Sequence, residues 1–220
     1  RLAERMQMSS SGAVRTVKRV CVNFGFLNEN SFSSRNEIDI QNLLTNRGKL
    51  VYQAAKLEEQ VGLADNYEDD VKEKIYAEIK KLYEEAYCDA LRFYYFKNSD
   101  GSKLHPLRAT LRALNKYGRM DKWEWYLLNT CIRHDDCDVE EATLDDYITR
   151  YRNGEYDFTM RNVVEKPKGH QYTPQYFEFA GLLHVIQRPE WSISDSGRHM
   201  EVKSEVLEAD FLEKLYGGSL

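Results

Sequence analysis

A histidine stands between two cysteines in the segment CIRHDDC, where side chains of these types could bind a metal ion. Cys131, His134 and Cys137 offer the thiolate and imidazole groups that Zn²⁺ accepts as ligands. A structural zinc site needs four ligands, however, and the sequence has no Cys-x-x-Cys pair to supply the rest. We therefore expect no metal site here, and expect the cysteines to pack beside a polar loop.

The tripeptide EVK, from Glu201 to Lys203, has the residue types of one half of a metal-dependent nuclease site. In such a site carboxylates hold Mg²⁺ and the lysine orients the attacking water. A second acid must lie close by, and Asp195 is the near candidate. Because we expect a helix to begin at Ser194, Asp195 and Glu201 would fall on different faces of it. We therefore expect no catalytic residue in this chain.

Basic side chains are the stronger functional candidates, because they are segregated along a chain whose net charge is −5. Residues 1–24 contain five Arg or Lys and one Glu, and residues 102–122 contain six and one Asp. Residues 57–90 contain eleven acidic residues and four Lys. Segregated charge steers a polyanion onto one face of a protein. The alternative, in which these charges only solvate helix faces, stays open.

The candidate DNA-binding residues lie on four segments that could face one duplex. Arg and Lys neutralise phosphates, whereas Arg, Gln and Asn can also read base edges in the major groove. The candidates are Arg15, Lys18 and Arg19; Arg47 and Lys49; Arg108, Arg112, Lys116 and Arg119; and Arg161, Lys166, Lys168, His170, Gln171 and Gln175. The last group leads into the final amphipathic helix, where a helix-turn-helix places its base-reading end.

Capping residues and periodicity predict the elements that would position these side chains. An amphipathic helix with a basic outer face is expected after Ser9–Ser11 and ends at Gly25. The letters LLT should form a short strand, and their Thr45 should cap the next helix. The acidic segment YEDDVKEKIYAEIKKLYEEAY, residues 67–87, is expected to form an exposed scaffold helix that carries no chemistry.

A helix-turn-helix is expected in the segment HPLRATLRALNKYGRMDKWEWYLLNTC. Pro106 suits the start of its first helix, Gly118 suits the end of that helix, and Asp121 can cap the second helix. The first helix should bury three leucines, Leu107, Leu111 and Leu114. A third helix in VEEATLDDYITRYRNG completes a trihelical unit.

The last segment is expected to contain a wing. Thr173 should cap a short helix, after which LLHVI and WSI pair as strands with QRPE at their tip, and Ser194 caps a further helix. The predicted fold is mainly α, with tandem winged-helix and helix-turn-helix modules and short β-wings. Its expected parts are an N-terminal winged-helix module, 1–56; acidic connecting helices and a loop, 57–102; a helix-turn-helix module, 103–153; and a C-terminal winged-helix module, 154–220.

The order of these segments resembles the recognition region of type IIS restriction and nicking endonucleases of the AlwI type. The resemblance is carried by LHPLRATLRALNKYGRMDKWEWYLL, by RNVVEKPKGHQYTPQYFEFAGLLHV, and by FGFL with LLTNRGKLVY in the first module. It implies that winged-helix subdomains recognise a short asymmetric site on double-stranded DNA. It also implies that a separate C-terminal nuclease domain, not in this chain, cuts the DNA with Mg²⁺. The chain begins at Arg1 rather than Met, so we expect it to be part of a longer protein.

Two other functions stay open. A winged-helix transcription regulator would bind a palindrome as a homodimer, and a protein-interaction scaffold would bind acidic or basic partners instead of DNA. We expect a monomer that binds double-stranded DNA, with no cofactor of its own and no membrane partner. Four cysteines without framework spacing, and no apolar run of about 18 residues, favour a cytoplasmic protein.

Overall fold

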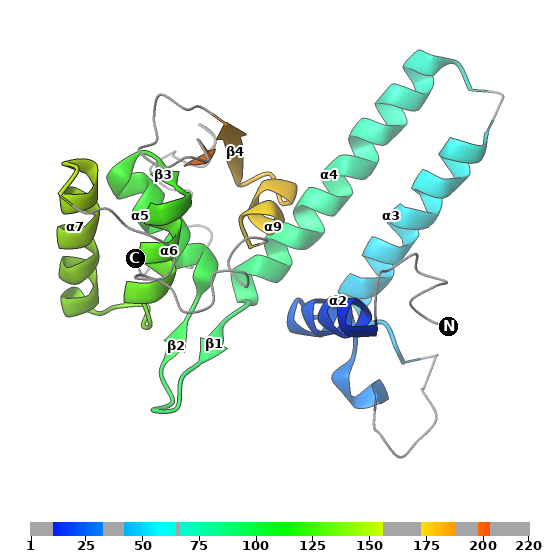
Figure 1. The fold of residues 1–220 in the computed structure, drawn as a ribbon. Coiled ribbons are helices and arrows are strands. Elements are labelled where there is room, and N and C mark those ends of the chain that lie inside the picture. Colours follow the sequence, from blue (N-terminus) through cyan, green and yellow to red (C-terminus); the bar gives the residue numbers. More distant parts are fainter. Residues whose placement is uncertain (1–10, 33–41, 65–66, 156–172, 188–197, 203–220) are drawn as a thin grey trace. The chain divides into compact units, whose positions relative to one another are not determined.

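The computed structural model describes residues 11–32, 42–64, 67–155, 173–187 and 198–202 (Figure 1). These residues form seven α-helices, one 3₁₀-helix and five short strands, so the expectation of a mainly α-helical chain is confirmed. The chain divides into two compact units, residues 1–90 and 91–220. Within the described residues, no helix combines the length and the apolarity needed to cross a membrane.

The first unit is built from helices. They are α2 (Ser11–Asn23), the 3₁₀-helix η1 (Glu29–Phe32), α3 (Asn46–Leu63) and α4 (Asp69–Phe93), whose last residues belong to the second unit. Phe24 and Phe26 are buried and meet Tyr87 of α4 edge-on, with ring centroids 6.0 and 5.1 Å apart. These rings fasten the turn after α2 to α4.

Helix α3 begins where the sequence predicts, at Thr45. The Thr45 hydroxyl accepts the backbone N–H of Gly48 at 3.0 Å and donates to the carbonyl of Gly25 at 2.5 Å. Leu27 and Leu44 form an isolated antiparallel bridge beside this cap. Gly25 has φ +68°, and a Cβ on Gly48 would lie 1.9 Å from the carbonyl oxygen of Phe26. Glycine at Gly48 therefore lets α3 start directly against the preceding turn.

The second unit holds the remaining elements in this order: β1 (Phe96–Lys97), β2 (Lys103–Leu104), α5 (Pro106–Tyr117), β3 (Met120–Asp121), α6 (Lys122–Cys131), α7 (Asp138–Arg152), α9 (Thr173–Phe179), β4 (Leu183–Gln187) and β5 (Arg198–Val202). The strands β1 and β2 pair as an antiparallel hairpin around the loop that the sequence predicts.

Local signals place α5 and α6 correctly. Pro106 occupies the first turn of α5, and Gly118 ends the helix with φ +76°. Asp121 caps α6 through a capping box: its side chain accepts the N–H groups of Trp123 and Glu124, and the Glu124 carboxylate accepts the Asp121 N–H. Two helices separated by a short connection therefore lie where the sequence predicts them.

The core of the second unit gathers between α5, α6, α7 and α9. The three leucines expected to be buried on α5, Leu107, Leu111 and Leu114, are all buried. Phe177 of α9 is fully buried, and its ring packs edge-on against Trp125 of α6 with centroids 6.1 Å apart. The aromatic ring of Phe177 therefore anchors α9 to α6.

A three-stranded sheet joins distant parts of the second unit in the order β3-β5-β4. Met120 pairs with Met200, and Leu183 pairs with Val202. The ranges 103–153 and 154–220 therefore share one sheet. The helix expected from Ser194 is wrong for residues 198–202, which form β5. In the structure, β5 is the strand that pairs with LLHVI. The backbone groups of β5 bond to β3 on one side and to β4 on the other, and the local helix signal at Ser194 does not reveal this pairing.

Candidate functional site

The basic residues of α5 face acidic residues of α7 and of the loop before it. We call Arg108, Arg112 and Lys116 the basic stripe. The guanidinium of Arg108 lies 3.0 Å from the Asp136 carboxylate, and Lys116 pairs with Asp145 of α7 at 2.5 Å. Each member of the basic stripe therefore has an acidic partner within the same unit.

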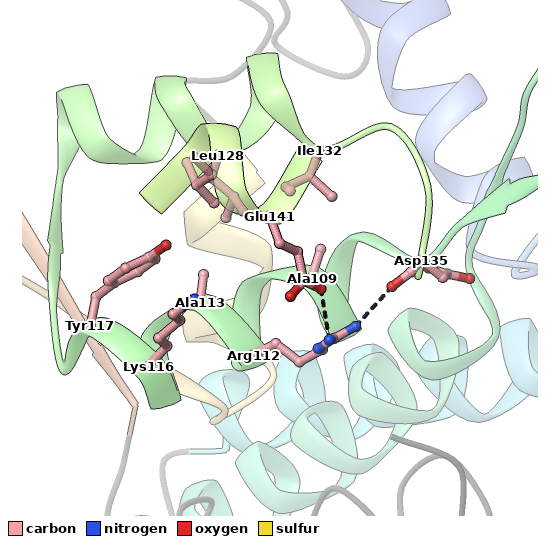
Figure 2. Close-up of a pocket in the computed structure, with 10 residues that line it drawn as sticks. Ala109, Arg112, Ala113, Lys116, Tyr117, Leu128, Ile132, Asp135 and Glu141 are labelled. Atoms are coloured by element: carbon pink, nitrogen blue, oxygen red, sulfur yellow. Dashed lines mark hydrogen bonds and ion pairs between the residues drawn. The ribbon is translucent and has the colours of Figure 1, made fainter. Parts of the chain in front are cut away.

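Arg112 is the centre of this arrangement, and Figure 2 shows its guanidinium between Asp135 and Glu141. Its Nη1 donates to the main-chain oxygen of Asp135 at 2.8 Å, and its Nη2 lies 2.7 Å from Oε1 of Glu141. The pocket beside it has a volume of about 50 Å³ and is lined in part by Ala109 and Leu128. That volume suits a water molecule or two, so the pocket offers no room for a nucleotide or another organic ligand.

Asp145 also receives a second hydrogen bond, from the hydroxyl of Tyr117. Burial opposes ionisation of Asp145, but the hydrogen bonds from Lys116 and Tyr117 outweigh it and lower the pKa of the carboxyl group. Burial, and then the hydrogen bond to Asp145, raise the pKa of Tyr117. Tyr117 therefore stays a neutral donor, and Asp145 stays an anion that holds Lys116.

The basic stripe is only partly available to a phosphate. The exposed fractions of the side chains are 13% for Arg108, 33% for Arg112 and 52% for Lys116. A phosphate must compete with a carboxylate that is already in place, and Lys116 is the easiest to reach. The DNA contact expected from these residues stays a prediction, whereas their role in joining α5 to α7 is observed.

The candidates in the first unit divide into exposed and structural side chains. Arg15, Lys18 and Arg19 are exposed on α2, as expected, and Arg19 pairs with Glu29 at 3.3 Å. Lys49 is exposed on the first turn of α3.

Arg47 differs from the other candidates of the first unit, because its guanidinium bonds Asp89 of α4 and the main-chain oxygen of Phe24. It therefore ties α3 to α4 and to the turn after α2.

The structure describes only the end of the segment from Arg161 to Gln175, which was expected to contact DNA bases. Gln175 is half-buried on α9, and Arg119 precedes β3. Five candidates lie outside the described residues, namely Arg161, Lys166, Lys168, His170 and Gln171.

A buried network of polar side chains joins the start of α6 to the end of α7. The sequence did not indicate this network. Asp121 and Glu124 are 2% and 3% exposed. The Tyr151 hydroxyl donates to Asp121 at 2.7 Å, and the guanidinium of Arg152 donates to Glu124 at 2.5 Å. Burial raises the pKa of Glu124, and the Arg152 guanidinium opposes that rise. The sequence indicated Asp121 as a helix cap, but it did not indicate Glu124 or the partners of both residues on α7.

The loop between α6 and α7 gathers a histidine and carboxylates. Nδ1 of His134 lies 2.7 Å from Oε1 of Glu140, and Nε2 lies 3.4 Å from Asp100 at the β1–β2 turn. The hydrogen bond that the His134 ring donates to Glu140 is the main cause that raises the pKa of His134. Sequence reasoning named His134 but missed Glu140 and Asp100. The Glu140 position could have been suggested by its place on the first turn of a helix that follows His134.

No protein-family model, curated protein or solved structure matches the chain. Its function is therefore inferred from the residues and their geometry.

Proposed function

We propose that the chain recognises a specific site on double-stranded DNA, as the target-recognition part of a type IIS-like restriction endonuclease. The observation that carries the proposal is the order of elements in the second unit: α5, β3 and α6, then α9 followed by the β4–β5 pair, with the sheet order β3-β5-β4. In this order the two helices α5 and α6 are followed by a later helix, α9, and then by two strands that pair with each other, one of which also pairs with β3. Such an order suits a winged-helix module. The resemblance of the sequence to endonuclease recognition regions supports the same function.

Helix α9 is the element that we assign to base reading. Phe177 is fully buried against Trp125, so this side of α9 is committed to the core. Gln175 stands two residues earlier, about 200° around the helix from Phe177. Its amide can donate and accept hydrogen bonds at once, as the edge of adenine requires in the major groove. Helix α9 therefore has one side fixed in the core and an amide on the other side. This arrangement suits a helix that contacts bases in the major groove.

The basic residues whose side chains are exposed to solvent make the phosphate contacts. On the first unit these are Arg15, Lys18 and Lys49, which are exposed. On the second unit Lys116 is half-exposed although it is paired with Asp145. The basic residues among 161–171 lead into α9 and complete the set. Arg108 and Arg112 serve chiefly to hold α7 against α5.

The test is selection of bound duplexes from a randomised pool by the wild-type chain and by two amide variants. Gln175→Ala should relax the preference at one or two base pairs, at a cost of about 1–3 kcal/mol of discrimination each. Gln53→Ala removes an exposed amide from α3 and serves as the matched control, which should select the wild-type motif. An unchanged motif from Gln175→Ala would show that α9 is not the reading helix.

The oligomeric state on DNA separates the endonuclease from the transcription regulator. A monomer on an asymmetric motif supports the endonuclease, and a dimer on a palindrome supports the regulator. The chain should not nick supercoiled plasmid with Mg²⁺, because we assign its catalytic chemistry to a separate domain. Nicking that disappears in an Asp195→Ala, Glu201→Ala double variant would contradict that assignment.

A further inference from the structure

Three potential metal ligands of different chemistry meet in the loop between α6 and α7. His134, Cys137 and Glu140 each offer one ligand atom, and these atoms all lie within 4.8 Å of one another. The three side chains are half-buried. An imidazole, a thiol and a carboxylate together make a ligand set that Zn²⁺ accepts in proteins. The set differs from the one considered from sequence, because Glu140 takes the place of Cys131.

The thiol of Cys137 does not cap the helix that it precedes. Cys137 is the N-cap of α7, with φ −143° and ψ 98°, and its side chain makes no capping hydrogen bond. Ser, Thr, Asp and Asn are the residues favoured at an N-cap, because their oxygen accepts a helix N–H. Cysteine here therefore contributes a thiol to the loop without contributing a cap.

Glu140 and His134 are already held in place by other groups. Oε2 of Glu140 accepts the backbone N–H of Arg133 at 2.8 Å and that of His134 at 3.1 Å, which leaves Oε1 on Nδ1 of His134. The other ring nitrogen, Nε2, lies 3.4 Å from Asp100, whose own carboxylate is held by Ser102. A histidine that ligates a metal through one ring nitrogen usually donates a hydrogen bond from the other ring N–H to a carboxylate. Asp100 lies where that carboxylate is needed.

We propose that the chain binds a borderline-soft divalent cation, with Zn²⁺ preferred, through Sγ of Cys137, Nδ1 of His134 and Oε1 of Glu140. Asp100 orients the imidazole from the outer shell, and water fills the fourth position. The metal displaces the proton shared by Nδ1 and Oε1 and the proton of the Cys137 thiol, and both protons pass to solvent water. Because Zn–N and Zn–O distances are about 2.0–2.2 Å, these two atoms must move apart from 2.7 Å by somewhat less than about 1 Å.

The test is a titration of the whole chain, without DNA, by Co²⁺ followed by Zn²⁺. Co²⁺ bound to a thiolate gives a near-ultraviolet charge-transfer band, and added Zn²⁺ should remove it at one equivalent. Cys137→Ala should abolish the band and weaken Zn²⁺ binding by more than about 100-fold, since even outer-shell partners are worth about 10–100-fold. Asp100→Asn should weaken it by about 10–100-fold and keep the band.

The matched control is Cys131→Ala, which removes a half-buried thiol six residues earlier and should leave the band and the affinity unchanged. Circular dichroism of each variant reports whether α6 and α7 have folded, and His134→Gln gives a second ligand removal that keeps the size of the side chain. No stoichiometric binding by the wild-type chain overturns the proposal. Binding that survives Cys137→Ala and His134→Gln, or that is lost with Cys131→Ala, overturns it equally. These results do not depend on whether the chain binds DNA.

Discussion

The guanidinium of Arg112 on α5 lies 2.7 Å from the carboxylate of Glu141 on α7, two residues separated by a whole helix and a loop. Around this pair, Arg108 meets Asp136 and Lys116 meets Asp145. A basic segment and an acidic segment of the sequence therefore neutralise one another within one unit. Segregated charge in this chain stabilises the trihelical arrangement, whatever else it binds.

Replacement of Arg112 by alanine tests that structural role. The variant loses a half-exposed ion pair and a hydrogen bond to the main-chain oxygen of Asp135. We expect the free energy of unfolding to fall by about 1–2 kcal/mol in denaturant titrations, because hydrogen bonds to charged groups contribute more than neutral ones. Lys81→Ala, which removes an exposed lysine from α4, is the control and should change little. Equal midpoints for both variants would show that the Arg112 contacts add no stability.

Two glycines of α3 should respond to alanine in opposite directions. A Cβ on Gly48 would lie 1.9 Å from the carbonyl oxygen of Phe26, so Gly48→Ala forces the backbone to move and should cost more than about 2 kcal/mol. At Gly62 the nearest atom is the Tyr76 hydroxyl at 3.6 Å. Gly62→Ala should therefore stabilise the helix by about 0.5–1 kcal/mol. Thermal unfolding measures both, and a stable Gly48→Ala protein would contradict the packing of α3 on the preceding turn.

Arg152→Ala should destabilise the second unit in a manner that depends on pH. It leaves the Glu124 carboxylate, 3% exposed, without its guanidinium, which should cost about 3 kcal/mol. Burial already raises the pKa of Glu124, and removal of Arg152 raises it further. A carboxyl group with a raised pKa favours the folded state at low pH and loses that contribution as the pH rises through its folded value. The loss should therefore be smaller in acidic than in alkaline buffer, as denaturant titrations at both would reveal; the opposite trend would contradict the buried pairing.

The His134–Glu140 pair should stabilise the fold within a limited pH window. The pKa of His134 is raised from 6.5, chiefly by the hydrogen bond that its ring donates to Glu140, so its contribution is complete below 6.5 and is lost above the folded value. The pKa of Glu140 is lowered from 4.5, since hydrogen bonds from Arg133 and His134 outweigh burial, and its contribution is lost on acidification. In metal-free buffer, the NMR titration midpoint of the His134 ring should fall toward its ordinary value in Glu140→Gln. A midpoint that does not move would contradict the pairing.

Local chemistry explains which parts of the fold could be predicted from the sequence. Pro106, Gly118 and Asp121 define helix ends within a few residues, and the structure confirms them. Strand β5 could not be predicted, because it lies between β4 and β3, and β3 stands far earlier in the chain. The partner of Arg112 on α7 could not be predicted either, because it also lies far from Arg112 in the sequence.

The candidate sites follow the same division between local and distant signals. The exposed basic residues of α2 were foreseen from helical spacing, and Arg15 is exposed as expected. The grouping of His134 with Asp100 needed the β1–β2 turn to fold back toward the loop before α7. Residues 161–171, which carry much of the expected DNA contact, lie outside the described residues.

The salt dependence of duplex binding tests the central claim most directly. The wild-type chain should be titrated into a fluorescently labelled duplex that contains its selected motif, at several salt concentrations, with anisotropy as the readout. Each neutralised phosphate contributes about −0.9 to the slope of log affinity against log salt. With about five to eight contacts, an increase of about fourfold in salt should weaken binding by roughly a thousandfold or more. Tight binding with a flat salt response, or no binding at low salt, would contradict DNA recognition by this chain.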